Sequence, residues 1–313
     1  MKMQQVIDSA VTTIRRPRVS RLQRREWLAA ALFIAPNMIG LVVFILGPVI
    51  AGFLLSFTKW DMLSPPEWIG LENYRALLFD DPLFWLTLKN TLYYTVLVIP
   101  IGTTISLGLA LALNTSLKGV AIYRTIFFIP VVASAVAVAV VWKWVFQPDF
   151  GLLNALLRSI GIKPQGWLND PSQAMPSVAA VAIWQGMGYN MVIFLAGLKG
   201  IPRHLYEAAA LDGARGWQRF WYITLPLLTP TLFFVLIMSI ISSFQVFAQV
   251  FVMTQGGPGN ATRVYVYYLW ENAFSWFKMG YASAMAYILF LIILVITILQ
   301  VKFLGRRVQY ELG

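Results

Sequence analysis

The sequence predicts an all-α membrane protein that crosses the bilayer six times, with both termini in the cytoplasm. Three observations support this fold class. Hydrophobic residues make up 59% of the 313 residues and charged residues only 12%, about half the charged fraction of a soluble domain. Six apolar stretches each reach the roughly 20 residues that a spanning helix needs. Lys and Arg gather in alternate connecting segments, which is typical of a multispan protein.

The chain divides into a basic N-terminal segment, a membrane domain and a short cytoplasmic tail. Residues 1–27 carry seven Lys and Arg side chains and are expected to anchor at the lipid surface. They are not a secretory signal, because the apolar run that follows is too long and lacks a cleavage pattern. Residues 28–304 hold the spans and residues 305–313 form the tail. The six spans are expected at 28–57, 90–114, 125–147, 176–200, 227–252 and 281–304.

The distribution of charge orients these spans. Four connecting or terminal segments hold 16 of the 24 Lys and Arg residues but only 5 of the 13 Asp and Glu residues. The positive-inside rule places these segments, and therefore both termini, in the cytoplasm. The net charge of +11 is thus a consequence of topology, and nucleic acid is not an expected partner. The four segments are 1–27, 115–124, 198–226 and 302–313.

The outer loops are expected at 58–89, 148–175 and 253–280. In the second loop, Leu152 to Ile160 can form a short amphipathic helix. In the third loop, Gly256 to Gly259 superficially resembles a phosphate loop. A phosphate loop needs a Lys-Ser/Thr pair after its glycines and a strand before them, and neither is present in the sequence. We therefore expect a turn there and no ATP site on this chain.

The residues missing from the sequence exclude several kinds of site. The chain has no Cys and only one His, His204, so disulfides and thiolate metal sites are excluded and a zinc site lacks ligands. No Asp, Glu or Arg falls within the six predicted spans. Buried ionisable groups mark proton relays and ion-coupled sites, so their absence disfavours an ion-coupled carrier and an intramembrane hydrolase. It also disfavours an anionic substrate, although a helix terminus can hold one.

Neutral polar residues are concentrated in the fourth and fifth spans. Gln185 and Tyr189 are four residues apart and share one helix face. Ser239 and Ser243 share another. Such residues either bond neighbouring helices to each other or line a cavity for a neutral solute such as a sugar, whose hydroxyls need hydrogen bonds and whose C–H faces pack on aromatic rings. The candidate cavity residues are Gln185, Gly186, Tyr189, Asn190, Ser239, Ser242, Ser243, Gln245 and Gln249.

A polar stretch that contains proline and glycine, residues 201–226, separates these two spans on the cytoplasmic side. Pro202 is placed to start a helix, since proline at the first helical position costs no hydrogen bond. Gly213 is placed to end that helix in the left-handed conformation. Asp212 is a candidate cap for the helix that follows. The stretch therefore predicts two short helices joined at Gly213.

The motif Glu207-Ala208-Ala209-Ala210-Leu211-Asp212-Gly213-Ala214, continuing to Pro226, resembles the signature loop of importer-type ABC transporter permeases. Two outer-loop motifs, Trp68 to Tyr74 and Thr254 to Pro258, resemble the carbohydrate branch, the permeases for maltose, multiple sugars and glycerol phosphate. The resemblance extends over roughly residues 25 to 310. It implies a type I ABC importer permease fold in a bacterial or archaeal cytoplasmic membrane.

The resemblance also implies partners and roles. The polar loop would dock in a groove of a cytoplasmic ATPase subunit, through Glu207, Ala208, Ala209, Asp212 and Gly213. An ATPase dimer has two such grooves, so a second permease chain, usually a different but related one, is expected beside two ATPase copies. An extracytoplasmic sugar-binding protein would deliver the solute. ATP and Mg would bind to the ATPase subunits, while this chain binds no cofactor and catalyses no reaction.

Two other classes of function remain as alternatives. An ion-coupled secondary carrier for a neutral solute would need an intramembrane acid or an inverted repeat, and the sequence has neither. A membrane-bound enzyme or scaffold would need a catalytic constellation or partners of another kind. Within the importer reading, the identity of the sugar stays open, and so does a glycerol phosphate.

Overall fold

The computed structural model describes residues 21–115 and 118–303. The chain separates into two compact units, residues 1–54 and 55–313, which are described in turn. The first part of the predicted basic segment, residues 1–20, and the predicted tail lie outside the described residues.

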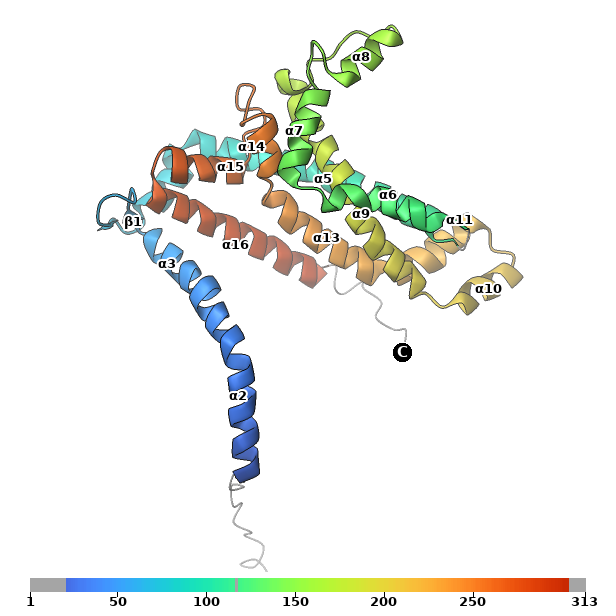
Figure 1. Ribbon diagram of the computed structural model, residues 1–313, viewed down its shortest axis with the longest axis horizontal. Helices are drawn as coiled ribbons and strands as arrows, with labels where there is room; N and C mark the ends of the chain where they lie inside the picture. The colour runs from blue at the N-terminus through green and yellow to red at the C-terminus, as the bar shows by residue number, and fades with distance from the viewer. Residues whose placement is uncertain (1–20, 116–117, 304–313) are drawn as a thin grey trace, which may run out of the picture. The chain divides into compact units, whose positions relative to one another are not determined.

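The first unit is one long helix. Helix α2 (Arg21–Leu41) continues through a π-helical turn, Val42–Leu46, into α3 (Gly47–Leu55) (Figure 1). The apolar helix Leu22–Leu55 has 34 residues, a length of about 50 Å, which exceeds the roughly 30 Å of a bilayer core. Its sequence from Trp27 onward is apolar on all sides of the helix except at Asn37. A helix without a polar face is typical of a membrane span, as predicted.

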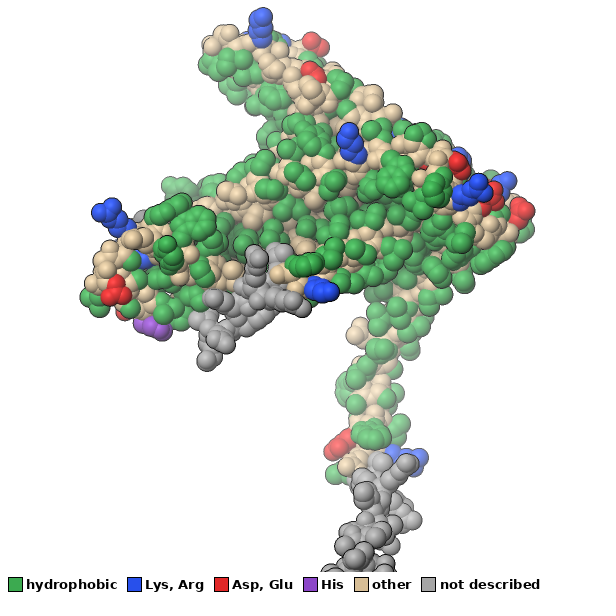
Figure 2. All heavy atoms as spheres, turned by 180° about the vertical axis from the view of Figure 1, so that it is seen from behind, with side chains coloured by type: hydrophobic (Ala, Val, Ile, Leu, Met, Phe, Trp, Pro, Cys, Tyr) green, Lys and Arg blue, Asp and Glu red, His purple; other side chains and the backbone are tan. Residues whose placement is uncertain are grey.

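Four long helices form the body of the second unit. They are α5 (Pro82–Leu113), α9 (Pro171–Lys199), α13 (Thr229–Phe244) and α16 (Met279–Phe303). Helix α9 packs along α5, and α13 packs against α5, α9 and α16. Hydrophobic side chains cover most of the face between the ends of this unit, and charged side chains gather at its extremities (Figure 2). This surface matches a body embedded in lipid with its charges in water.

The third predicted span is not a single straight helix. Helices α6 (Val120–Val132) and α7 (Ala135–Val145) meet at a bend of 97°. Ala133 and Ser134 both have extended backbone conformations, with ψ angles of 142° and 131°. Within the described residues there are thus five apolar helical segments long enough to cross a membrane, and a sixth crossing if the bent pair is one span.

The fifth span is also interrupted. Helix α13 ends at Phe244, and α14 (Ala248–Met253) begins after three non-helical residues. Non-helical backbone at membrane depth is tolerated where it lines a cavity or is buried in protein. Both interruptions therefore indicate a cavity or a protein contact beside them.

The outer segments contain short elements. The predicted amphipathic helix of the second loop is confirmed as α8 (Leu152–Ser159). Strands β1 (Thr58–Lys59) and β2 (Glu67–Trp68) pair antiparallel in the first loop. The remaining elements are α4 (Glu72–Arg75), α15 (Tyr265–Trp270), the 3₁₀ turn Trp167–Asn169, and the π-helical turns Ala76–Asp80 and Glu271–Ser275.

Asp81 joins three helices at one end of the bundle. Its Oδ1 caps α5 by accepting hydrogen bonds from the backbone N–H groups of Leu83 (2.9 Å) and Phe84 (3.2 Å). Its Oδ2 accepts hydrogen bonds from the phenols of Tyr268 on α15 (2.7 Å) and Tyr281 on α16 (2.6 Å). Burial raises the pKa of the Tyr268 phenol, which keeps this group protonated and able to donate. The Asp81 carboxylate thus joins α5 to α15 and α16, which come almost 200 residues later in the sequence.

Candidate functional site

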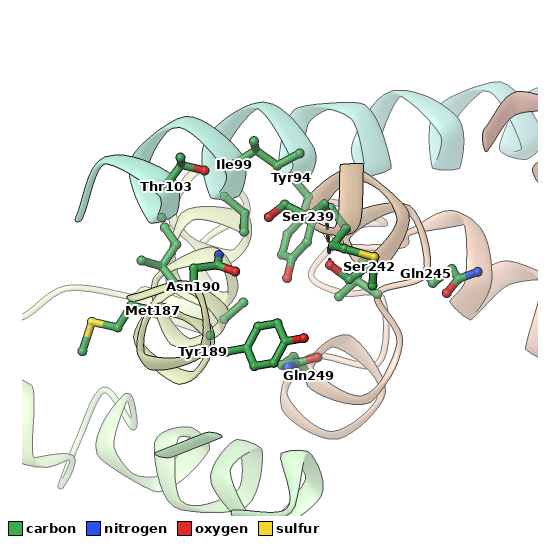
Figure 3. Close-up of a pocket in the computed structure, with 18 of the residues that line it drawn as sticks. Tyr94, Ile99, Thr103, Met187, Tyr189, Asn190, Ser239, Ser242, Gln245 and Gln249 are labelled. Atoms are coloured by element: carbon green, nitrogen blue, oxygen red, sulfur yellow. Dashed lines mark hydrogen bonds between the residues drawn. The ribbon is translucent and has the colours of Figure 1, made fainter. Parts of the chain in front are cut away.

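A cavity of about 660 Å³ lies between α5, α9 and the interrupted span α13–α14 (Figure 3). This volume is within the range of sites for small organic ligands. All the side chains that line it are uncharged. They combine hydroxyl and amide groups with the aromatic rings of Tyr94, Tyr189 and Phe247. The cavity can therefore hydrogen-bond a polar neutral molecule and pack against its apolar faces.

Eight of the nine residues predicted from the sequence line this cavity. The exception, Gln185, lies next to the lining: the Nε2 of Gln249 donates a hydrogen bond to the Oε1 of Gln185 (3.3 Å). The structure thus brings the polar residues of two spans together around one space, while their contact with a solute stays a prediction. The eight are Gly186, Tyr189, Asn190, Ser239, Ser242, Ser243, Gln245 and Gln249.

Some of the polar groups have their hydrogen bonds satisfied by the protein and others do not. The Oγ of Ser242 donates to the carbonyl of Ser239 (3.1 Å), as serines in helices commonly do. The side chains of Asn190 and Gln245 form no hydrogen bond with any residue in the part of the chain that the structure describes. In Figure 3, Asn190 points into the cavity from α9. Its amide is free to bond water or a solute.

The sequence did not indicate the wall that α5 contributes. Tyr94, Val98 and Gly102 follow one another at intervals of four and so share a face, and all three line the cavity. Thr103 also lines it, and its buried Oγ1 has no hydrogen-bond partner among the described residues. The periodicity was visible in the sequence, but it does not tell which face of an apolar helix meets a cavity.

The cytoplasmic stretch forms a helical hairpin. Helix α10 (Arg203–Leu211) is followed by α11 (Gly216–Arg219), by the π-helical turn Phe220–Thr224 and by α12 (Leu225–Leu227). Gly213 has a φ of +78°. The N–H groups of Ala214 and Gly213 donate to the carbonyls of Ala209 (2.9 Å) and Ala210 (3.1 Å), the two bonds of a Schellman motif. The prediction that Gly213 ends the first helix is confirmed.

Two details of the hairpin differ from the sequence prediction. Pro202 is the N-cap of α10 and not its first helical residue. The prediction that Asp212 caps the second helix is wrong, because Asp212 is the C-cap of α10. The reversal at Gly213 places Arg215 at the N-cap of α11, and its N–H donates to the Oε1 of Gln218 (2.7 Å).

The hairpin presents one surface outward and is anchored by another. Glu207, Ala208, Asp212 and Gly213 are exposed, and Ala209 is half-buried. At the tip, Leu211 is 90% exposed and, on α11, Trp217 is 71% exposed. On the anchored side, the hydroxyls of Tyr206 and Thr224 are hydrogen-bonded (3.0 Å). Leu205 and Tyr206 also pack against a buried cluster that includes Leu198, Ile201 and Leu228.

The first and third outer loops enclose a second hollow of about 550 Å³. Its lining includes charged groups of both signs and two indole rings. Hydrogen bonds from the side chain and backbone of Ser64, and from the backbone of Leu63, lower the pKa of Asp61 to about 2, so this carboxylate is ionised at neutral pH. The charged and indole residues of this outer hollow are Lys59, Trp60, Asp61, Glu67, Trp276 and Lys278.

Comparison with known proteins assigns the chain to a family. Residues 102–310 match the family described as "Binding-protein-dependent transport system inner membrane component". The chain is 42% identical over 296 residues to the probable ABC transporter permease protein YesP of Bacillus subtilis, covering 93% of this chain and 95% of that protein. It is 36% identical over 282 residues to the arabinooligosaccharides transport system permease protein AraP of the same organism, covering 88% of each.

A solved structure has the same fold. A chain of a bacterial alginate ABC transporter, in complex with an alginate pentasaccharide-bound periplasmic protein, aligns with a TM-score of 0.80 and 25% identity. The alignment covers 91% of this chain and 96% of that chain. The fold is that of a type I ABC importer permease, as expected, and the protein is integral to a membrane. The chain therefore belongs to the family of inner membrane components of binding-protein-dependent transport systems.

Proposed function

We propose that this chain is the permease subunit of an ATP-driven importer for a neutral sugar or oligosaccharide. The observation that carries the proposal is the uncharged cavity beside two interrupted spans, with free amides and aromatic rings in its wall. Sugars are recognised by this combination, because their hydroxyls need directional partners and their C–H faces pack on rings. The relative that is named for arabinooligosaccharide transport supports the same substrate class, and the alginate transporter supports a saccharide cargo in general.

The hairpin of α10 and α11 is the proposed point of coupling. Leu211 at its tip and Trp217 on α11 are exposed in a segment predicted to be cytoplasmic, where lipid does not cover apolar side chains. Glu207 offers a carboxylate to a basic group of that partner, and the small side chains of Ala208 and Ala209 allow a close approach to the helix backbone. The partner is a cytoplasmic ATPase subunit, which binds ATP and Mg, whereas this chain has no phosphate loop.

The proposed composition of the transporter follows from the number of hairpins on each permease chain. One chain carries one hairpin, so an ATPase dimer requires a second, related permease chain. The outer hollow, with charges of both signs, faces the side from which a sugar-binding protein would deliver its cargo. The membrane is the cytoplasmic membrane, since the hairpin must meet ATP. Movement of the ATPase subunits would shift the hairpin and switch the cavity between outward and inward access.

The charge of the cargo distinguishes this chain from one of its structural relatives. That transporter is described as importing the acidic polysaccharide alginate. Among the described residues, the cavity wall contains no Lys or Arg, so the cavity offers no side-chain cation to an acidic sugar or to a glycerol phosphate. We therefore expect neutral sugars to be preferred.

The test is uptake by the complete transporter in proteoliposomes. Neutral oligosaccharides, uronate oligosaccharides and glycerol 3-phosphate are offered to the binding protein, with ATP inside. We expect uptake of a neutral sugar that stops when the ATPase subunit is made inactive. Preferred uptake of an anionic compound would contradict the neutral-cargo proposal. Uptake that survives an inactive ATPase and collapses with an uncoupler would identify an ion-coupled carrier instead.

Replacement of the cavity amides tests the site itself. Asn190→Leu and Gln249→Leu each remove a hydrogen-bonding side chain that lines the cavity. Loss of one hydrogen bond to a neutral group costs about 1 kcal/mol, so we expect the KM for sugar uptake to rise roughly fivefold in each variant. Asn169→Leu makes the same chemical change on the exposed outer 3₁₀ turn and is expected to behave as wild type. Unchanged KM values in both cavity variants would show that the cargo binds elsewhere.

A further inference from the structure

Two interrupted spans approach the same unbroken helix. The bend between α6 and α7 lies at Ala133 and Ser134, and the break between α13 and α14 lies at 245–247. Helix α9 passes both points without interruption. Interrupted membrane helices leave backbone carbonyls without helical partners, and these are satisfied by neighbouring side chains.

One side chain of α9 bonds to both interrupted spans. The Nε2 of Gln185 donates a hydrogen bond to the carbonyl of Ala133 (3.2 Å). The Oε1 of Gln185 accepts a hydrogen bond from the Nε2 of Gln249 on α14 (3.3 Å). We call this chain of groups, from Gln249 through Gln185 to the Ala133 carbonyl, the glutamine relay. It uses both polar ends of the Gln185 amide.

The relay lies where the two halves of the third span separate. The first half, α6, packs on α9, and the second half, α7, turns away from it. Helix α6 lies directly on α9 at Gly188, one turn from Gln185, where a Cβ would collide with the carbonyl of Phe127. Beyond Ala133 the chain turns by 97°, and α7 packs against α14. The Nζ of Lys143 on α7 donates to the carbonyl of Val252 at the far end of α14 (3.2 Å). Helices α7 and α14 therefore form a pair. The pair packs on α9 through a buried apolar cluster that includes Val138, Val181 and Val250, and the relay adds a polar attachment at the end of this contact where the two spans are interrupted.

Gln249 belongs to the relay and to the cavity at once. It lines the cavity, as Tyr189 does, and both side chains are labelled in Figure 3. The Gln249 amide has two N–H donors, and one of them bonds Gln185. A cargo hydroxyl that draws the Gln249 side chain into the cavity and takes this donor breaks the bond to Gln185. In that binding mode, occupancy of the cavity and attachment of the pair through the relay are alternatives.

We propose that Gln185 is a positioning residue that holds the α7–α14 pair against α9 until cargo engages Gln249. This role rests on the proposed function and differs from the cargo contact that the sequence predicted for Gln185. The relay biases an equilibrium between an attached and a released α7–α14 pair. Cargo shifts this equilibrium because cargo binds Gln249 with a different affinity in the two states. Binding of the cargo and release of the pair are thereby coupled.

The test uses the complete transporter in nanodiscs, with neither sugar nor binding protein. Because the chain has no native Cys, spin labels can be placed at Ile126→Cys on α6 and Val141→Cys on α7, both exposed in this chain. We expect one narrow distance distribution in the wild-type sequence and a broadened or displaced one with Gln185→Leu. Asn169→Leu, outside the relay and the cavity, is the matched control and should leave the distribution narrow.

ATP hydrolysis supplies a readout that a purely structural role would not move. If the relay stabilises the resting arrangement, its loss raises hydrolysis per assembled complex in the absence of binding protein. Each hydrogen bond between membrane helices is worth about a 2.8-fold change in population, so Gln185→Leu, which removes two, should raise this rate roughly eightfold. A loss of stability alone would lower it.

The outcomes are distinct from those of the uptake test, because no sugar is present. Unchanged distances and unchanged hydrolysis with Gln185→Leu would overturn the proposal. In the separate uptake assay, a Gln185→Leu variant that changes only the KM for sugar would also overturn it, since that result identifies a cargo contact. Should Gln185→Leu fail to assemble, Gln249→Leu breaks the relay from its other end, and a narrow wild-type distribution in that variant overturns the proposal equally.

Discussion

At the scale of single residues, Gly188 determines how closely α6 approaches α9. A Cβ at this position would collide with the backbone of Phe127 and Phe128, and backbone cannot move aside as a flexible side chain can. We expect Gly188→Ala to destabilise the protein by about 1–3 kcal/mol, the usual cost of overpacking. Thermal unfolding of the purified transporter checks this.

The neighbouring glycine supplies a control for that experiment. A Cβ built at Gly186, two residues earlier on the same helix, meets nothing within 4 Å. Gly186→Ala should therefore unfold at the wild-type temperature. Equal losses in the two variants would mean that glycine is needed on α9 for its backbone alone and not for the close contact with α6.

Residue types alone predicted which side chains line the cavity, but they did not predict which side chains hydrogen-bond to each other. Ser, Gln and Asn in apolar spans are conspicuous, and eight of the nine predicted residues line one cavity. Asp81 was not singled out, because its two tyrosine partners lie 187 and 200 residues away in the chain. Such pairings depend on tertiary packing, which residue spacing does not encode.

At the scale of elements, the α10–α11 hairpin depends on Gly213. Its φ of +78° is a conformation that costs an L residue about 1 kcal/mol or more. Gly213→Asp should deform the hairpin, and Glu207→Ala should remove the charge offered to the ATPase. We expect both variants to reach the membrane and to lose uptake, together with co-purification of the ATPase subunit.

A second glycine in the hairpin again allows a matched comparison. Gly216 has no positive φ, and a Cβ there meets nothing within 4 Å. Gly216→Ala is expected to retain uptake and to retain the ATPase subunit. Wild-type transport by both Glu207→Ala and Gly213→Asp would show that coupling takes place through another surface.

The long apolar segments were predicted in their order along the chain, and the bent pair α6–α7 stands where the third span was expected. Their interruptions were not predicted. Hydropathy located the span drawn at 125–147, yet the chain turns by 97° inside it. The residues at the turn, Ala133 and Ser134, are not helix breakers, and Pro130 lies within α6. The break at 245–247 likewise contains no Gly or Pro. Tertiary contacts determine the non-helical conformation at both places, because the helix propensities of these residues do not by themselves end a helix.

At the scale of the whole molecule, topology is open to direct measurement. Leu63 is 88% exposed in the first outer loop, and Lys118 is exposed in a segment predicted to be cytoplasmic. In a chain without native Cys, an impermeant maleimide should label Leu63→Cys in intact spheroplasts. Lys118→Cys should react only after permeabilisation. Labelling of Lys118→Cys from outside would invert the topology drawn from the Lys and Arg distribution.

Whole-molecule properties were the most predictable, because they sum over many residues. The fold class follows from composition and span length, and the family follows from the motif at Glu207 to Ala214. The proposed second permease chain is a property of the assembly, and the sequence of this chain predicts it only through the resemblance.

The Asp81 cluster also bears on how the protein is made. The carboxylate can cap α5 as soon as Leu83 and Phe84 leave the ribosome, but Tyr281 is synthesised 200 residues later. At about 5–20 residues per second, this is an interval of roughly 10–40 seconds. For most of that interval Oδ2 lacks both tyrosine partners, because Tyr268 is itself 187 residues away in the chain. The bonds from Tyr268 and Tyr281 therefore close the bundle only when its last helix arrives, and a truncated chain that ends before α15 never acquires them.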